Sequence, residues 1–206
     1  MQLFVCVVLV GVVYADASRE ASVGETTKTV PDWANEERFG KFQNAWAGIN
    51  DTTAFYYMYA ATYETETTFG GNFSCLNVHT TSVREHEKTV DAVMSYKDST
   101  GQWKQTEITT KAISKYSYST ENALEYGPKG STGKKDVGVV VFSDSKNCDI
   151  MSVKNGEHLE LWVNQDVKDA VPDCCLFTFA YFSVKTTTTT THKFYEQGNC
   201  KKNDGK

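Results

Sequence analysis

The chain has 206 residues and a mass of 23.0 kDa, which favours one domain large enough to enclose a core. Its net charge of −5 and pI of about 5.4 argue against nucleic-acid binding, which needs a basic surface. Three prolines and short apolar runs indicate strands more than helices.

Residues 1–15 form an apolar segment that is too short to span a bilayer and ends in small residues, as is typical of a secretory signal peptide. Cleavage after Ala15 or Ala17 would release a secreted, extracellular protein, with a membrane anchor as the alternative. Residues 16–30 are polar without periodicity and predict a flexible N-terminal tail. Residues 31–206 then form the main domain.

A helix is predicted after Pro31, with Asp32 as its N-terminal cap. Its apolar residues recur at helical spacing and would form one stripe: Phe39, Phe42, Trp46 and Ile49. The stripe is expected to pack against the rest of the domain, because its polar face is not strongly basic.

Residues 54–63 form the most aromatic stretch and predict a strand. Alternation would place one set of side chains on one side: Phe55, Tyr57, Tyr59, Ala61 and Tyr63. The opposite side, which carries Tyr56, Met58 and Ala60, is not polar either. Two non-polar faces favour the wall of a closed barrel with a lined interior.

Further strands are predicted at 72–81, 90–96, 103–110, 112–118, 123–126, 137–142, 148–153 and 159–163. A second helix is expected at 174–184, capped by Asp173, and the threonine run 186–191 predicts a last extended strand. A mucin-like stalk is the alternative for this run, although it lacks proline. This order indicates an all-β fold with flanking helices, an eight-stranded antiparallel barrel that can hold one small ligand.

Catalytic and metal-binding patterns are absent from the sequence. No nucleophile elbow, phosphate-binding loop or dinucleotide motif occurs, so we expect no enzyme and no cofactor. The four histidines are scattered, which argues against a metal site. Asn50 and Asn72 begin glycosylation sequons. The cysteines beyond residue 15 predict two disulfides and one odd thiol: Cys75, Cys148, Cys174, Cys175 and Cys200.

Six carboxylates lie within or beside apolar strands and turns: Asp51, Glu66, Glu107, Asp136, Asp149 and Glu160. Any one of them could simply face solvent. Glu160 shares a strand face with Trp162, however, and several acids among aromatic residues predict an internal site. An ammonium or imidazolium ligand would supply their charge partner, with cation–π attraction from the rings.

Nine short segments in this order and spacing give the chain a resemblance to the tick histamine-binding proteins, secreted salivary lipocalins that sequester biogenic amines. They are DWAN (32–35), NAW (44–46), YYM (56–58), NFSC (72–75), ENA (121–123), FSD (142–144), NCD (147–149), ELW (160–162) and PDCC (172–175). The resemblance covers nearly all of the mature chain and implies a lipocalin-like barrel with two internal amine pockets.

The resemblance also implies which residues line the pockets. One would use Tyr63, Glu66, Glu107 and Tyr126, and the other Asp51, Phe69, Asp149, Glu160 and Trp162, with Asp136 as a further lining residue. It further implies the disulfides Cys75–Cys200 and Cys148–Cys175. Cys174 is then left over, either as a free thiol in a monomer or as the link between the chains of a homodimer.

The expected function is capture of histamine, with serotonin as a second amine, to suppress host inflammation. The alternative is a lipid mediator such as a leukotriene, or a host protein, as the partner. Neither nucleic acid nor a membrane is expected as a partner.

Overall fold

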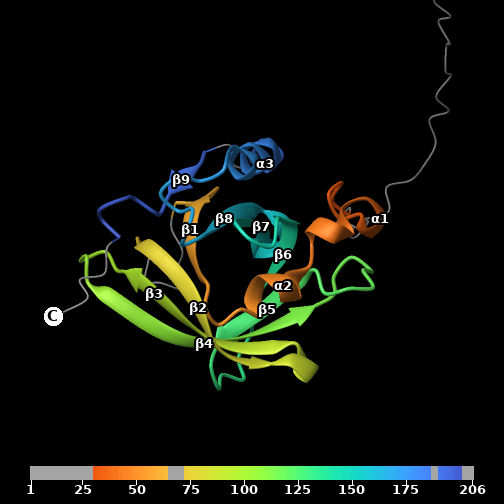
Figure 1. Ribbon diagram of the computed structural model, residues 1–206, viewed down its shortest axis with the longest axis horizontal. Helices are drawn as coiled ribbons and strands as arrows, with labels where there is room; N and C mark the ends of the chain where they lie inside the picture. Colours follow the sequence, from red (N-terminus) through yellow and green to blue (C-terminus); the bar gives the residue numbers. More distant parts are fainter. Residues whose placement is uncertain (1–29, 65–71, 187–189, 201–206) are drawn as a thin grey trace, which may run out of the picture.

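The computed structural model describes residues 30–64, 72–186 and 190–200 (Figure 1). Its strands are β1 (Phe55–Ala61), β2 (Ser74–Arg84), β3 (Thr89–Lys97), β4 (Trp103–Ile113), β5 (Ala123–Pro128), β6 (Asp136–Ser143), β7 (Cys148–Val153) and β8 (His158–Asn164). Each strand from β2 to β7 pairs antiparallel with the next, and β1 pairs with both β8 and β2. These pairings close an eight-stranded antiparallel barrel, which confirms the predicted fold class.

Two strand predictions differ from the structure. The strand expected at 112–118 does not form, because β4 runs through Ile113 and Tyr116 and Ser117 then adopt left-handed backbone angles. The last strand, β9, is the two-residue segment His192–Lys193, which pairs with the end of β1 and follows the threonine run. Residues 187–189 of that run lie outside the described residues.

A β-bulge divides β1 into two halves. Met58 lies opposite Trp162, but Ala60 lies opposite Leu161, so one extra residue is inserted between them. Tyr59 and Ala60 consequently pack on the outside of the barrel, while Tyr63 belongs to the inner core. The expectation that Tyr59 and Tyr63 share a face is therefore wrong, since simple alternation does not survive a bulge.

The N-terminal segment forms three short pieces, not one continuous helix: α1 (Glu36–Phe39), η1 (Gly40–Phe42) and α2 (Ala45–Ile49). Asn35 caps α1 and Asn44 caps α2, each accepting a backbone N–H through its side chain, so Asp32 is not the cap. Phe42 is exposed and contacts Phe142 of β6, whereas Trp46 belongs to the inner core, so the predicted single apolar stripe is also wrong.

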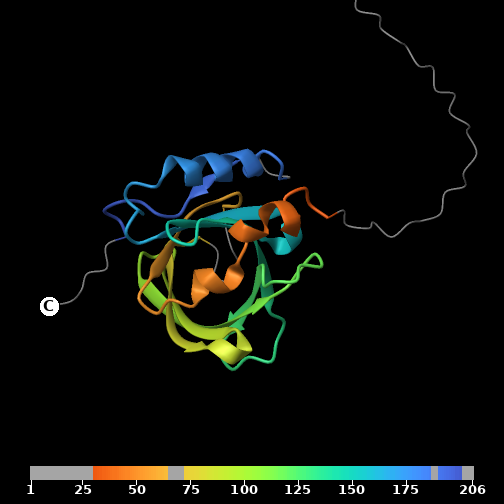
Figure 2. The same ribbon diagram turned by 45° about the vertical axis from the view of Figure 1, so that its right-hand side comes forward.

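The α2 helix lies across one end of the barrel (Figure 2). The Nε1 of Trp46 donates to Glu85 in the 3₁₀ turn η3 (Glu85–Glu87) between β2 and β3, at 3.0 Å. The hydroxyl of Thr80 on β2 donates to the carbonyl of Ile49 at 2.8 Å. These contacts fasten α2 to the barrel rim and make it the floor of the interior.

The last helix, α3 (Asp173–Ser183), packs on the outside of the barrel against β7 and β8 (Figures 1 and 2). It begins after Pro172, and Asp173 is its first residue, so Asp173 does not cap it as expected. No helix among the described residues is long and apolar enough to cross a membrane.

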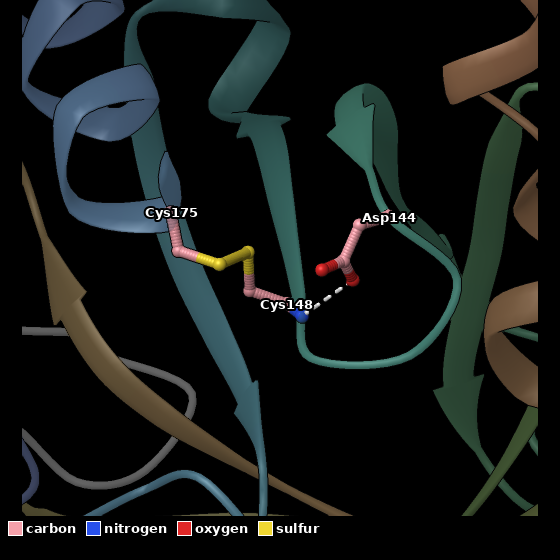
Figure 3. A group of neighbouring side chains, drawn as sticks. All are labelled: Asp144, Cys148 and Cys175. Atoms are coloured by element: carbon pink, nitrogen blue, oxygen red, sulfur yellow. Dashed lines mark hydrogen bonds between the residues drawn. A yellow bond between two sulfur atoms is a disulfide. The ribbon is translucent and has the colours of Figure 1, made fainter. Parts of the chain in front are cut away.

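Both predicted disulfides are present. Cys75–Cys200 links β2 to the C-terminal segment, and Cys148–Cys175 links β7 to α3, while Cys174 is an exposed free thiol. The carboxylate of Asp144 lies beside the second disulfide (Figure 3) and accepts backbone N–H groups, among them that of Cys148 at 3.0 Å. Because both sulfurs are already bonded to each other, this cluster stabilises a turn and does not form a metal site.

Candidate ligand-binding cavity

The barrel encloses a cavity of about 360 Å³, within the size range of small-molecule sites. Its walls are mainly apolar, and α2 forms its floor. The apolar lining consists of Ile49, Leu76, Val78, Met94, Ile108, Leu124, Val137, Met151 and Val153. Polar side chains enter this lining from β1, β5, β6, β7 and β8, where they can fix the orientation of a ligand.

Glu160 is the most buried acid of the cavity, with 9 % of its surface exposed. The hydroxyl of Tyr63 donates to its Oε1, and the indole Nε1 of Trp162 donates to its Oε2 at 2.8 Å. Both donors are neutral and fix the orientation of the carboxylate, whose negative charge is complementary to a cationic donor.

Asp149 is a second acid of the cavity and lies near the floor. It stands opposite Trp162 on the neighbouring strand, and a Cβ placed on Gly48 of α2 would lie 3.4 Å from its Oδ2. Because Gly48 has no side chain, the space beside the carboxylate stays open. Burial raises the pKa of Asp149 to about 6. A hydrogen bond with Ser143 partly opposes this shift, and the negative charge of Asp144 adds to it.

Tyr56 also lines this lower part of the cavity. Burial, and next the negative charge of Asp149, raise the pKa of its phenol to about 12. Tyr56 is thus a neutral hydroxyl at physiological pH. Strand alternation predicts Tyr56 on the side of β1 opposite Tyr57, but Tyr56 is not among the predicted site residues.

The far end of the cavity is a mouth formed by the β5–β6 loop and by the 3₁₀ turn η4 (Lys154–Gly156) between β7 and β8. Tyr126 and Asp136 face each other there across the β5–β6 pair. Lys134, Lys135 and Lys154 complete the lining. These lysines are not among the predicted site residues, because lysines in polar loops normally mark solvent-facing turns.

The structure brings six of the predicted site residues into the cavity: Tyr63, Tyr126, Asp136, Asp149, Glu160 and Trp162. Asp51 lies outside it, where it accepts the N–H and hydroxyl of Thr53 at 2.7 Å and lines a small adjoining pocket of about 40 Å³. Glu66 and Phe69 lie outside the described residues.

Glu107 is the clear error among the predicted site residues. Its side chain is 66 % exposed on the outer wall and forms an ion pair with Lys129 at 3.1 Å. Its neighbours in the strand, Ile108 and Thr110, point inward instead. The alternating residues Trp103, Gln105, Glu107 and Thr109 share the outer face of β4.

The division into two pockets also changes. Tyr63 was expected in one pocket and Glu160 in the other, yet the two residues are hydrogen-bonded to each other. Glu160 is bonded to Trp162 as well, so the three form one polar group in the wall of a single cavity.

Comparison with known proteins matches this chain to the tick histamine binding protein family over residues 33–202. The chain belongs to that family. A male-specific histamine-binding salivary protein of Rhipicephalus appendiculatus is 34 % identical over 189 residues, which cover 88 % of this chain and 92 % of the relative. A female-specific histamine-binding protein of the same tick is 31 % identical over 157 residues, covering 72 % and 79 % respectively.

Among solved structures, the fold of this tick histamine-binding family member resembles that of AM182 in complex with serotonin. The TM-score is 0.55 at 20 % identity, over 76 % of this chain and 92 % of that one. This likeness supports the barrel fold.

Proposed function

We propose that this protein captures a small cationic amine, histamine first and serotonin second, inside its barrel. The observation that carries the proposal is a carboxylate inside the cavity: Glu160 is nearly excluded from solvent and accepts hydrogen bonds from Tyr63 and Trp162 in an aromatic wall. Family membership supports the same ligand class. A buried carboxylate of this kind gains most from a ligand that brings a positive charge.

The capture we propose is non-covalent. The ligand ammonium donates to Glu160 or Asp149, and its ring packs against Tyr63, Trp162 and Tyr126. Removal from water strengthens each charge interaction, because the effective dielectric constant inside the barrel is lower than in bulk solvent. No bond is made or broken, so the protein acts by lowering the concentration of free amine.

Sequestration in this way would act outside the cell that makes the protein. The predicted signal peptide at 1–15 and the tail at 16–30 fit a secretory route, and the male-specific relative is salivary by name. Asn50 and Asn72 are exposed, as glycan acceptors must be. Binding of host histamine at a feeding site would suppress inflammation.

Titration calorimetry of the mature protein with histamine and with serotonin tests the proposal. Glu160→Gln keeps the shape of the side chain but removes its charge, and we expect a loss of about 10- to 100-fold in histamine affinity. Glu107→Gln is the matched control on the outer wall and should leave the affinity unchanged. Equal affinities of the wild type and Glu160→Gln would refute the proposed site.

An anionic lipid mediator is the second candidate ligand. The cavity wall is mainly apolar, and three lysines, Lys134, Lys135 and Lys154, line its mouth, where a lipid carboxylate could pair with them. Competition between a fatty acid and histamine, followed in the wild type and in Lys134→Gln, distinguishes this ligand. Fatty-acid binding that Lys134→Gln weakens would favour an anionic lipid as the ligand.

A further inference from the structure

We propose that Lys154 is a tethered cation that contacts the ring of Tyr63 and competes with the ammonium of the ligand for that ring. This inference rests on the proposed capture of amines. The Nζ of Lys154 lies 4.1 Å from the centroid of the Tyr63 ring, well within the range of a cation–π contact. Both residues line the cavity, so this ammonium lies where an entering cation would meet the ring.

The ring of Tyr63 is held in place from several sides. His158 contacts it edge-on with centroids 5.6 Å apart, and Phe194 packs against it at 5.9 Å. Its hydroxyl donates to Glu160, the acid that we assign to the ligand. The ring therefore cannot turn away from Lys154 without breaking these contacts, and release of the ring requires movement of the lysine.

The backbone of η4 explains how Lys154 reaches this place. Lys154 and Asn155 have φ angles of 50° and 59°, and Gly156 follows at 89°. Left-handed backbone is unfavourable for residues other than glycine, and two such residues in a row persist where the surrounding structure imposes them. This turn begins directly after Val153, a cavity-lining residue, and so starts the lysine at the cavity mouth.

Lys154 can also leave. The residue is exposed overall, and its long side chain can move its ammonium into water at the mouth. A simple cation that enters the cavity must displace the Lys154 ammonium before it can contact the Tyr63 ring. An aromatic amine can offset that loss with its own ring packing, so Lys154 would select for aromatic amines over plain alkylammonium ions.

The test compares Lys154→Gln and Lys154→Met with Lys193→Gln, which removes the same charge and a cation–π contact outside the cavity, where the Nζ of Lys193 lies 5.4 Å from the centroid of the Tyr59 ring. We expect histamine affinity to rise about 2- to 30-fold in both Lys154 variants, which corresponds to one cation–π contact, and to change less than 2-fold in Lys193→Gln. Methylammonium should gain at least as much as histamine. Unchanged or weaker histamine binding in the Lys154 variants, with normal binding by the wild type, would overturn the inference.

A second measurement does not depend on affinity. Ring currents of Tyr63 should shift the Lys154 side-chain Hε NMR signals upfield in the empty protein, and Lys154→Gln identifies these signals by their loss. They should return toward ordinary lysine positions when histamine saturates the barrel. Signals that are unshifted in the empty protein, or that stay shifted in the saturated complex, would refute the tethered cation. If neither the wild type nor any variant binds an amine, the proposed function itself fails, and this inference fails with it.

Discussion

The indole of Trp162 donates to the carboxylate of Glu160 at 2.8 Å, two residues away on the same face of β8. A strand places side chains i and i+2 on one face, so this pair is set by local geometry and needs no loop to form. Tyr63, which follows β1, completes the group by donating to the other oxygen of the carboxylate. The acid is thus held ready for a ligand by rigid elements of the barrel.

Tryptophan fluorescence should report ligand entry through this pair. Trp162 lines the cavity, whereas Trp103 packs on the outer face of β4. We expect histamine to change the emission of the wild type and of Trp103→Phe, but to leave that of Trp162→Phe nearly unchanged. Trp162→Phe should also bind more weakly, because Glu160 loses one hydrogen bond. An undiminished signal in Trp162→Phe would show that the ligand binds elsewhere.

Asp149 predicts a pH dependence of binding. Because burial raises its pKa to about 6, this carboxylate takes up a proton as the pH falls from 7 to 5. Histamine affinity should therefore decrease over this interval, and Asp149→Asn should flatten the profile. Calorimetry at several pH values is the measurement. A profile that stays equally steep in Asp149→Asn would assign the titration to another group.

The raised pKa of Asp149 also affects stability, and here the pH dependence has the opposite sign to that of binding. The folded protein holds the Asp149 proton more tightly than the unfolded chain does, so the free energy of unfolding decreases as the pH rises from about 4 to about 6. At pH 7, Asp149→Asn should therefore raise the free energy of unfolding, by on the order of 1–3 kcal/mol. Urea unfolding at pH 7 and pH 4 checks this, because the gain should be largely absent at pH 4.

The main lines of the fold follow from features that the sequence displays. Turn residues divide apolar runs into strands, and β3, β6, β7 and β8 lie within two residues of their predicted bounds. The β1 bulge could not be predicted, because its cause is the pairing of Ala60 with Leu161 on a distant strand. The broken N-terminal helix was foreseeable in part, since Asn44 is a strong helix cap.

The site was predicted less well than the fold, and Glu107 shows why. It was selected as one of six acids beside apolar residues and was then assigned to a pocket by the family resemblance, but alternation along a strand does not say which face turns inward. Gln105 and Thr109 share its face, and Ile108 occupies the other face. Lys154 could not be predicted at all, because its contact with Tyr63 depends on three left-handed backbone angles in one turn.

Asp91 should be a stabilising residue on the outer wall. Arg84 donates two hydrogen bonds to its carboxylate, both at 3.0 Å, and Thr109 donates a third at 2.9 Å. The bonds from Arg84 come first among the causes that hold the pKa of Asp91 well below its usual range. The stability that it contributes is therefore present above about pH 4 and is lost as the pH falls further.

We expect Asp91→Asn to lower the free energy of unfolding by about 1–3 kcal/mol at pH 7. Glu87→Gln is the matched control, because Glu87 forms an exposed ion pair with the same Arg84 at 3.4 Å and should contribute less than about 1 kcal/mol. Urea unfolding measures both variants. If Asp91→Asn and Glu87→Gln lowered the free energy of unfolding equally, the hydrogen bonds to Asp91 would contribute no more than an exposed ion pair.

Cys174 should link two copies of the protein once it reaches an oxidising compartment. The thiol is exposed at the start of α3, and the same helix face carries Phe177, Tyr181 and Val184, which are 72 %, 50 % and 70 % exposed. Burial of this apolar face between two copies would bring their thiols together. On a non-reducing gel we expect a band of doubled mass that reductant removes and that Cys174→Ser lacks. Phe177→Ser should reduce the yield of the doubled band, and a wild-type protein that migrates entirely as a monomer without reductant would rule out the linked dimer.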